Sequence, residues 1–335
     1  MTGRGGADTS PPTDFGGTTG RLDPVVGRPG SGRSRRVAIM AAIVVAAVIV
    51  SLLLRGCGDD RRSGLDVYRG LGAWVDVFDY TSQGGRPPVG LPDIDTMADQ
   101  GVRTVYLHAA FGTDNFPGGV VPPELVMPIL ERAHKRGMNV VGWYAPRFVE
   151  PETDLARLLA IARFERDGQR FDGVAVDIED RSLADVSERN RRLVDLSTKL
   201  RDQLGDQATV GAVVLPTVLL EKVNDKFWPN FPWAGIAPFY DVWMPMTYWT
   251  DRLTASGYRD PNRLITESIA RTRELTGLTD APMHPIGGIG DKLTEGELAT
   301  YATTLRSVGA IGGSVYDYRT MPTGGWGVLR GNVPD

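Results

Sequence analysis

Residues 171–179 read FDGVAVDIE, a run of Val, Ala and Ile with Gly before it and acidic residues at its end. Short apolar runs of this kind are typical of strands buried on both faces, as in a parallel sheet. Alternate residues of a strand share a face, so Asp177 and Glu179 are expected to point to the same side, together with Ala175. The stretch therefore predicts a buried strand that ends in two neighbouring carboxylates.

Similar runs recur along the chain, with amphipathic stretches between them. The expected strands cover residues 72–79, 102–109, 139–145, 171–179, 208–215, 240–248, 283–290 and 311–318. The expected helices include residues 122–137, 152–168, 183–205 and 294–309. This alternation predicts a parallel sheet with crossover helices. Eight such units within residues 65–335 match a single (β/α)8 TIM barrel, whereas an open doubly wound sheet has fewer strands and a Gly-rich first turn.

The chain before the barrel has a different composition. Residues 1–36 are rich in Gly, Pro, Thr, Ser and Arg, which predicts a disordered cytoplasmic tail. Residues 37–54 carry no charge and are about long enough for a transmembrane anchor or signal segment. Arginines precede this segment, so the tail is expected to stay inside and the barrel, beyond a linker at residues 55–64, to be extracytoplasmic on a single-pass anchor in the cell membrane.

Cys57 is the only cysteine, and it follows the apolar segment in LLLRGCGDD. The acylated cysteine of a lipoprotein occupies such a place. Arg55 fits that signal poorly, however, and the apolar run is longer than the core of a secretory signal. An uncleaved anchor is therefore favoured, with lipidation at Cys57 as the alternative.

Charge and histidine content exclude several classes of function. The net charge is −4, and no stretch of the body is dense in Lys or Arg, which argues against nucleic acid as a partner. The chain has only three histidines, too few for a visible metal cluster or a metal-dependent lyase or phosphodiesterase. We expect no metal or cofactor, and we expect His108 on the second strand to be a packed, hydrogen-bonded residue.

The carboxyl ends of the strands are where a barrel of this kind builds its active site. Two neighbouring carboxylates resist double ionisation, so one of Asp177 and Glu179 is expected to have a raised pKa and to act as a general acid. The alternative is a purely structural pair that caps the next helix or bonds Arg181. The predicted catalytic residues are Glu179 and Asp177.

The segment DGVAVDIE resembles the DGxDxDxE signature of glycoside hydrolase family 18, the chitinase and endo-β-N-acetylglucosaminidase family. Asp172, Gly173, Asp177 and Glu179 match it. The resemblance implies a TIM barrel in which Glu179 protonates the leaving oxygen and Asp177 orients the substrate N-acetyl group that acts as nucleophile. Ala175 stands where the family has a third acid.

The sixth expected strand extends the resemblance, because MPMTYW is similar to the M-x-Y-D segment of that family. Tyr248 matches the tyrosine that contacts the reacting sugar, and Trp249 replaces an acid. Aromatic faces suit the apolar faces of sugar rings. The predicted substrate-binding residues are Asp172, Trp143, Tyr144, Tyr248, Trp249 and Tyr316.

The sequence thus predicts a membrane-anchored glycoside hydrolase that acts on a cell-wall or extracellular glycan. A conventional two-carboxylate mechanism would draw its second acid from Asp317, Asp79 or Asp251. The alternative, motivated by Ala175 and Trp249, is a degenerate barrel that binds glycan or a partner protein without cleaving it.

Overall fold

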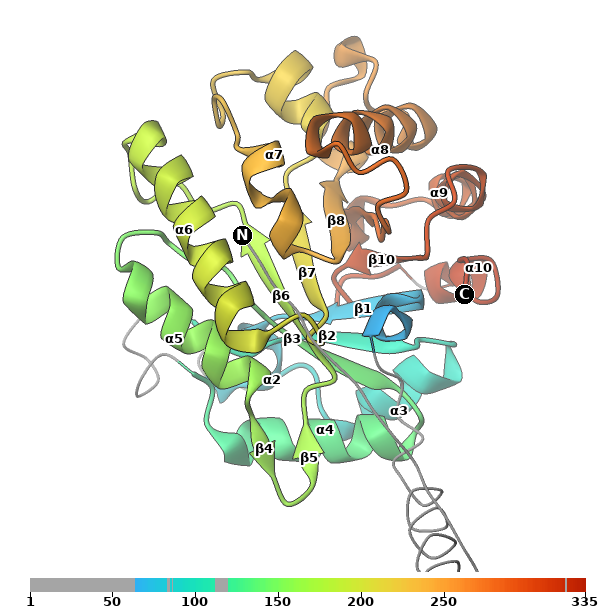
Figure 1. Ribbon diagram of the computed structural model, residues 1–335. Coiled ribbons are helices and arrows are strands. Elements are labelled where there is room, and N and C mark those ends of the chain that lie inside the picture. Colours follow the sequence, from blue (N-terminus) through green and yellow to red (C-terminus); the bar gives the residue numbers. More distant parts are fainter. Residues whose placement is uncertain (1–63, 83–84, 86, 112–119, 323) are drawn as a thin grey trace, which may run out of the picture. The chain divides into compact units, whose positions relative to one another are not determined.

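The computed structural model in Figure 1 describes residues 64–82, 85, 87–111, 120–322 and 324–335. The predicted tail (1–36), the apolar segment (37–54) and Cys57 lie outside the described residues, as does all of the predicted linker except Gly64. Among the residues that are described, no helix is both long enough and apolar enough to cross a bilayer.

Eight parallel strands close into a barrel, which confirms the predicted architecture of the body. In chain order they are β1 (Gly70–Val75), β2 (Thr104–His108), β3 (Asn139–Tyr144), β6 (Gly173–Ile178), β7 (Val210–Val214), β8 (Val242–Thr247), β9 (Ile286–Ile289) and β10 (Gly312–Tyr316). Each strand pairs with its neighbour in sequence, and β10 pairs with β1 to close the ring.

Helices lie around the strands, as Figure 1 shows. They are α2 (Val77–Tyr80), α3 (Leu91–Asp99), α4 (Pro123–Lys135), α5 (Pro151–Ala162), α6 (Val186–Leu204), α7 (Trp233–Ile236), α8 (Pro261–Thr276), α9 (Glu295–Ser307) and α10 (Gly325–Leu329). The helix expected over residues 152–168 is shorter than predicted. It ends at Ala162, and the hairpin of β4 (Glu165–Arg166) and β5 (Gln169–Arg170) follows it.

The first strand also ends earlier than its predicted range of 72–79. β1 stops at Val75, and Asp76 begins α2 as its N-cap. The Asp76 side chain accepts a hydrogen bond from the Phe78 N–H, and the Asp79 side chain accepts one from the Asp76 N–H. This reciprocal capping stabilises a helix start, which explains why the strand does not continue through the apolar residues 77 and 78.

The interior of the barrel is filled by a column of aromatic rings. Tyr68 lies at the amino-terminal end, with its ring centroid 6.4 Å from that of Tyr106. Tyr106 stacks on Trp74 at 4.5 Å, and Trp74 meets the edge of Trp143 at 5.6 Å. His108 stacks on Trp143 at 3.8 Å, so the column continues to the carboxyl ends of the strands. The carboxyl-terminal end of the barrel is called the mouth below.

Tyr68 closes the opposite end, called the base below, because two glycines leave room for its ring. A Cβ atom on Gly173 would lie 2.8 Å from the Tyr68 hydroxyl oxygen, and one on Gly211 would lie 3.0 Å from the ring. The hydroxyl donates to the carbonyl of Val174 at 2.8 Å. The glycine of the DG pair at the start of β6 is therefore required by packing.

Candidate active site

The barrel mouth holds a cavity of about 290 Å³. Its polar and aromatic lining comes from the ends of several strands, as expected for a barrel of this kind. These lining residues are Trp74, Asp76, His108, Phe111, Trp143, Asp177, Glu179, Tyr248 and Tyr316. The predicted site residues Asp177, Glu179, Trp143, Tyr248 and Tyr316 are thus brought together.

Asp177 and Glu179 enter this cavity from one strand end, as the alternation of β6 predicts. Asp177 is paired in register with Val213 of β7 and is only 7% exposed, whereas Glu179 lies just beyond the strand and is exposed at the mouth. No hydrogen bond or salt bridge from another described residue reaches either carboxylate, and the Asp177 Oδ1 atom is fully buried. The two acids are therefore held by their strand and not by side-chain partners.

The pKa of Asp177 is raised well above its usual value. Burial is the largest cause, and the negative charges of Glu179, Asp180 and Asp76 add to it. The pKa of Glu179 is also raised, because the surrounding walls of the cavity remove part of its water and Asp180 lies near. The pKa of Glu179 is raised even though its side chain keeps contact with solvent at the mouth. This pair of acids thus retains a proton at pH values above the ordinary pKa range of carboxyl groups.

Asp76 adds a third carboxylate to the cavity and belongs to a different network. Its Oδ2 atom lies 3.4 Å from His108 Nδ1 and accepts a hydrogen bond from the Tyr316 hydroxyl at 3.3 Å. Burial opposes ionisation of Asp76, but the contacts with His108 and Tyr316 outweigh it and lower the pKa of Asp76. Asp76 is therefore the anionic acid of the cavity, while Asp177 and Glu179 hold the proton.

His108 is a packed and hydrogen-bonded residue, as predicted. It is 5% exposed, its ring stacks on Trp143, and its Nδ1 atom faces Asp76. Because an ionised carboxylate only accepts hydrogen bonds, Nδ1 is assigned as the protonated nitrogen. In the described part of the chain, no group of three or more His, Cys, Asp and Glu side chains is arranged to hold a metal ion.

Aromatic side chains form the floor and one wall of the cavity. Trp143 is 4% exposed, and its Nε1 atom is buried without a hydrogen-bond partner among the described residues. The rings of Tyr248 and Tyr316 lie 6.2 Å apart. Burial and the nearby acids raise the pKa of both tyrosines, so both hydroxyls stay protonated and can donate hydrogen bonds. This arrangement can hold a sugar ring by its face and by its hydroxyl groups.

A second cavity of about 560 Å³ continues from the first. The two share Glu179, Met246, Tyr248 and Ile289, and together they form one cleft. The second cavity adds mostly side chains that follow β7 and β8, which include Leu219, Asn224, Phe227, Asp251 and Arg252. Glu179 thus stands at the junction between the two parts of the cleft.

Tyr144 and Trp249 do not line the cleft, which corrects the prediction of direct substrate contact for both. Tyr144 follows Trp143 on the opposite face of β3, and its hydroxyl donates to Asp154 at 2.6 Å in the helix layer. Trp249 is fully buried, with its ring 5.5 Å from Tyr301. A Cβ atom on Gly287 would lie 3.0 Å from the Trp249 ring, so the glycine in β9 makes room for it.

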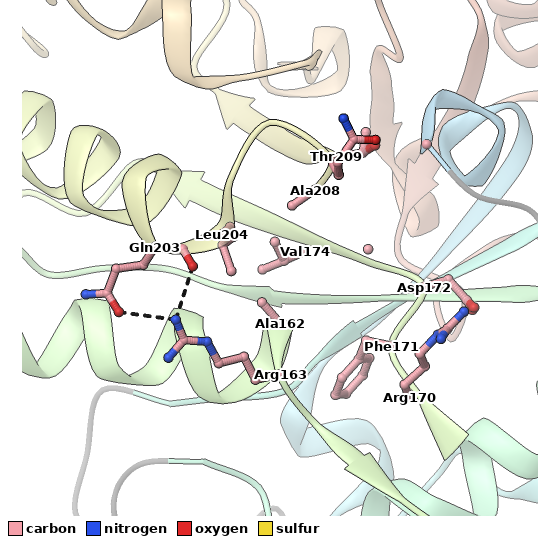
Figure 2. A pocket seen from close by; sticks show the side chains of 13 residues that line it. Ala162, Arg163, Arg170, Phe171, Asp172, Val174, Gln203, Leu204, Ala208 and Thr209 are labelled. Atoms are coloured by element: carbon pink, nitrogen blue, oxygen red, sulfur yellow. Dashed lines mark hydrogen bonds between the residues drawn. The ribbon is translucent and has the colours of Figure 1, made fainter. Parts of the chain in front are cut away.

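Asp172 is likewise corrected, because it precedes β6 and lies at the base of the barrel. Its Oδ2 atom accepts a hydrogen bond from the Val140 N–H at 2.8 Å and lies 2.9 Å from His134 Nε2. Asp172 lines a cavity of about 400 Å³ at this base. Figure 2 shows its side chain on one side of that cavity and Arg163, bonded to Gln203, on the other. Asp172 therefore matches the motif in sequence but holds strands together.

The other acids considered as second carboxylates have partners of their own. Asp79 is buried and accepts a hydrogen bond from Arg319 at 3.2 Å, and Asp317 accepts two from Thr320. Asp251 lies in the second cavity, 2.8 Å from Lys292 Nζ. Asp76 and Trp74 were not among the predicted site residues. Their spacing of two positions at the end of the first strand is the signal that indicates a shared face.

The same architecture occurs in solved structures with little sequence identity. A chitinase from Bacteroides thetaiotaomicron has a TM-score of 0.56 and 9% identity, over 79% of this chain and 96% of that chain. The endo-beta-1,4-mannanase from Thermotoga petrophila has a TM-score of 0.56 and 9% identity, over 76% and 69%. The PgaB (BpsB) glycoside hydrolase domain from Bordetella bronchiseptica has a TM-score of 0.52 and 14% identity, over 75% and 94%.

No family model matches the chain, and no curated protein is matched in sequence. The structural matches act on different glycans by their names, and at such low identity they show a shared fold alone. The body of this chain therefore has the barrel fold that occurs in glycoside hydrolases.

Proposed function

We propose that the barrel is a glycoside hydrolase, related to family 18, that cleaves a cell-wall or extracellular glycan containing N-acetylhexosamine. Glu179 is the general acid and Asp177 is its partner. The observation that carries the proposal is the position of both acids, with raised pKa, in a cleft floored by Trp143. A carboxyl group that stays protonated toward neutral pH is suited to protonate a leaving glycosidic oxygen.

The roles of the two acids follow from their burial. Glu179 is exposed where the two cavities meet, so it is within reach of an oxygen that links two sugars. Asp177 lies deeper, and no described residue donates a hydrogen bond to its carboxyl group, which is partly exposed to the cavity. The N–H of a 2-acetamido group would supply that donor and would be oriented for attack of its carbonyl oxygen on the anomeric carbon. The Tyr248 hydroxyl, which lines the same cavity, would donate a further hydrogen bond to this sugar.

The membrane anchor is part of the proposal. An uncleaved helix at residues 37–54 would hold the barrel on the outer surface of the membrane, next to a cell-wall glycan. Protease added to intact cells should then remove residues 65–335 from the membrane. Cleavage confined to residues 1–36 under the same conditions would show the opposite orientation.

The test of the activity is a hydrolysis screen with the full chain in detergent. Polymers of N-acetylglucosamine, mixed N-acetylhexosamine polymers and acetamido-free mannans are incubated with the wild type and with Glu179→Gln, and new reducing ends are counted. We expect the wild type to cleave an N-acetylhexosamine polymer, and we expect Glu179→Gln to bind that polymer without cleaving it. Equal cleavage by both proteins would place the acid elsewhere.

The alternative is a barrel that binds glycan without cleaving it. Ala175 favours it, because the family motif has an acid at this position, two residues before Asp177. The same screen separates the two functions. Binding of a glycan by the wild type with no new reducing ends on any polymer would support the binding protein and reject the hydrolase.

A further inference from the structure

Arg252 lines the second cavity, in the part that follows β8. It is half-buried, and its Nε atom donates to the carbonyl of Tyr248 at 3.3 Å. Within the described part of the chain, it forms no salt bridge with a carboxylate. Burial lowers the pKa of its guanidinium group, with the charge of Asp251 acting against that shift. Arginine remains charged in proteins, so the cleft contains a cation that forms no salt bridge with a described carboxylate.

The neighbouring side chains strengthen the positive character of this part of the cleft. Asp251 lies beside Arg252, but its carboxylate forms its salt bridge with Lys292, 2.8 Å from Nζ. Phe227 lines the same cavity, and the guanidinium group of Arg181 lies 3.8 Å from the centre of its ring. No carboxylate among the described residues forms a salt bridge with Arg181. Glu179, the remaining acid of the cavity, has a raised pKa and carries less negative charge than an ordinary glutamate.

We propose that the second cavity binds a carboxylate on the sugar at the leaving-group side of the cleaved bond, so that the substrate is an acidic glycan. The proposal rests on the proposed function, because it takes Glu179 as the group that separates the reacting sugar from the leaving sugar. A guanidinium group matches a carboxylate in shape and can bind it through two parallel hydrogen bonds. Phe227 offers an apolar wall for the ring that carries this carboxylate.

Two kinds of sugar supply a carboxylate next to an N-acetylhexosamine. A uronic acid carries it on the ring, and N-acetylmuramic acid carries it on a lactyl ether. The probes are hyaluronan oligosaccharides for the first and peptidoglycan strands stripped of peptides for the second. Each probe is compared with the same material after reduction of its carboxylates to alcohols, which keeps the chain and removes the charge.

Binding is measured by titration calorimetry with the full-length Glu179→Gln protein in detergent, so that no probe is consumed. We expect at least one acidic probe to bind roughly tenfold to a hundredfold more tightly than its reduced form, as for a hydrogen bond between charged groups that is lost. The probe that shows this difference identifies the source of the carboxylate. Equal affinity for acidic and reduced forms of both probes would overturn the proposal.

Variants add a second readout on the protein side. In the Glu179→Gln background, Arg252→Gln should bring the affinity ratio of acidic to reduced probe close to one. Arg252→Lys, which keeps the charge but not the forked shape, should give an intermediate ratio. Arg166→Gln is the matched control, since it removes the same charge from the exposed β4–β5 hairpin. A ratio that falls equally in Arg166→Gln and Arg252→Gln would overturn the proposal by showing a nonspecific charge effect.

These outcomes are distinct from a failure of the hydrolase itself. If the wild type cleaves neutral glycans and shows no preference for carboxylates, the hydrolase stands and the acidic substrate is rejected. If carboxylates bind in a manner that depends on Arg252 but no glycan is cleaved, the carboxylate site stands as a binding site and the hydrolase is rejected.

Discussion

The two ends of the barrel use the same residue type in opposite ways. At the base, Asp172 precedes β6 and Asp241 precedes β8, and each accepts a backbone N–H of the preceding strand at 2.8 Å. Each also faces a second partner, since His134 lies 2.9 Å from Asp172 and Arg201 lies 2.7 Å from Asp241. At the mouth, Asp177 has no hydrogen-bond partner among the described residues, and its pKa is raised well above the usual value by burial.

This comparison separates the two halves of one motif. The residues Phe171-Asp172 and Tyr240-Asp241 have the same pattern, an aromatic residue followed by an acid that ties one strand start to the strand before it. The beginning of DGVAVDIE therefore repeats a structural device of the barrel. Its end instead places two acids in the cleft, and no described residue donates a hydrogen bond to them.

The largest effect is expected at Glu179. Glu179→Gln should lower kcat by about 10²–10⁴, the usual contribution of a proton donor, on whichever glycan the wild type cleaves. The acid must be protonated to act, so the wild-type rate should fall as pH rises through the raised pKa of Glu179, and the variant should lack this fall. Initial rates from pH 4 to 9 measure both. A wild-type rate that instead increases through neutral pH would contradict the role as acid.

The second-largest effect is expected at Asp177, whose replacement by Asn should stabilise the folded protein. Its folded-state pKa is raised, so the folded protein binds the proton more tightly than the unfolded chain does. The free energy of unfolding should then fall as pH rises from the unfolded value toward the folded one, by about 1.4 kcal/mol for each unit of pKa difference. Asp177→Asn removes this penalty, so it should stabilise the protein more at pH 7 than at pH 4 while lowering activity.

Denaturant unfolding of both proteins at the two pH values measures this difference. Asp76→Asn is the matched control, because the pKa of Asp76 is lowered and its charge is stabilised by His108 and Tyr316. That variant should lose stability at pH 7. If both variants are more stable than the wild type at pH 7, or if neither is, then the pKa values of Asp177 and Asp76 are not shifted in opposite directions.

The acids at the base should behave in the opposite manner. Asp172→Ala and Asp241→Ala each remove an acceptor from a backbone N–H and from a cationic or imidazole partner, at a cost of about 1–3 kcal/mol in the free energy of unfolding. The kcat of the folded fraction should stay unchanged. A loss of activity in Asp172→Ala without a loss of stability would return Asp172 to the substrate-binding set predicted from the sequence motif.

The sequence was sufficient for the barrel and for the acids of β6, because strand alternation and apolar runs are local patterns. It was not sufficient where two local patterns compete. Asp76 and Asp79 cap a helix and end β1 at Val75, although apolar residues continue beyond it. The same limit applies to strand faces, since Trp143 and Tyr144 are neighbours in sequence, but only Trp143 points into the barrel.

Long-range packing accounts for the other differences. The place of Trp249 depends on Gly287, whose missing side chain leaves a space on the outer side of β9. Arg252 combines a place in the second cavity with the absence of a salt bridge within the described residues, which a sequence does not display. Motif matching found Asp177, Glu179 and Tyr248 in the cleft, and it failed for Asp172 and Trp249, whose places are set by contacts with other strands and helices.

The smallest predicted effect concerns Tyr144, which lies on the strand that bears Trp143 but outside the cleft. Tyr144→Phe removes its hydrogen bond to Asp154, which still accepts the Phe148 N–H at 2.9 Å, so the loss should be about 1 kcal/mol. That bond lowers the pKa of Asp154 against the larger effect of burial, which raises it. Without the bond the folded-state pKa rises further, and the ionised form is destabilised more. The difference between wild type and variant should therefore be larger at pH 7 than at pH 4 in denaturant unfolding.

Tyr248→Phe is the matched variant inside the cleft, and it should lower activity with little change in stability. A raised KM in Tyr144→Phe with unchanged unfolding would mean that this hydroxyl contacts substrate, and the outward position of Tyr144 would then be wrong.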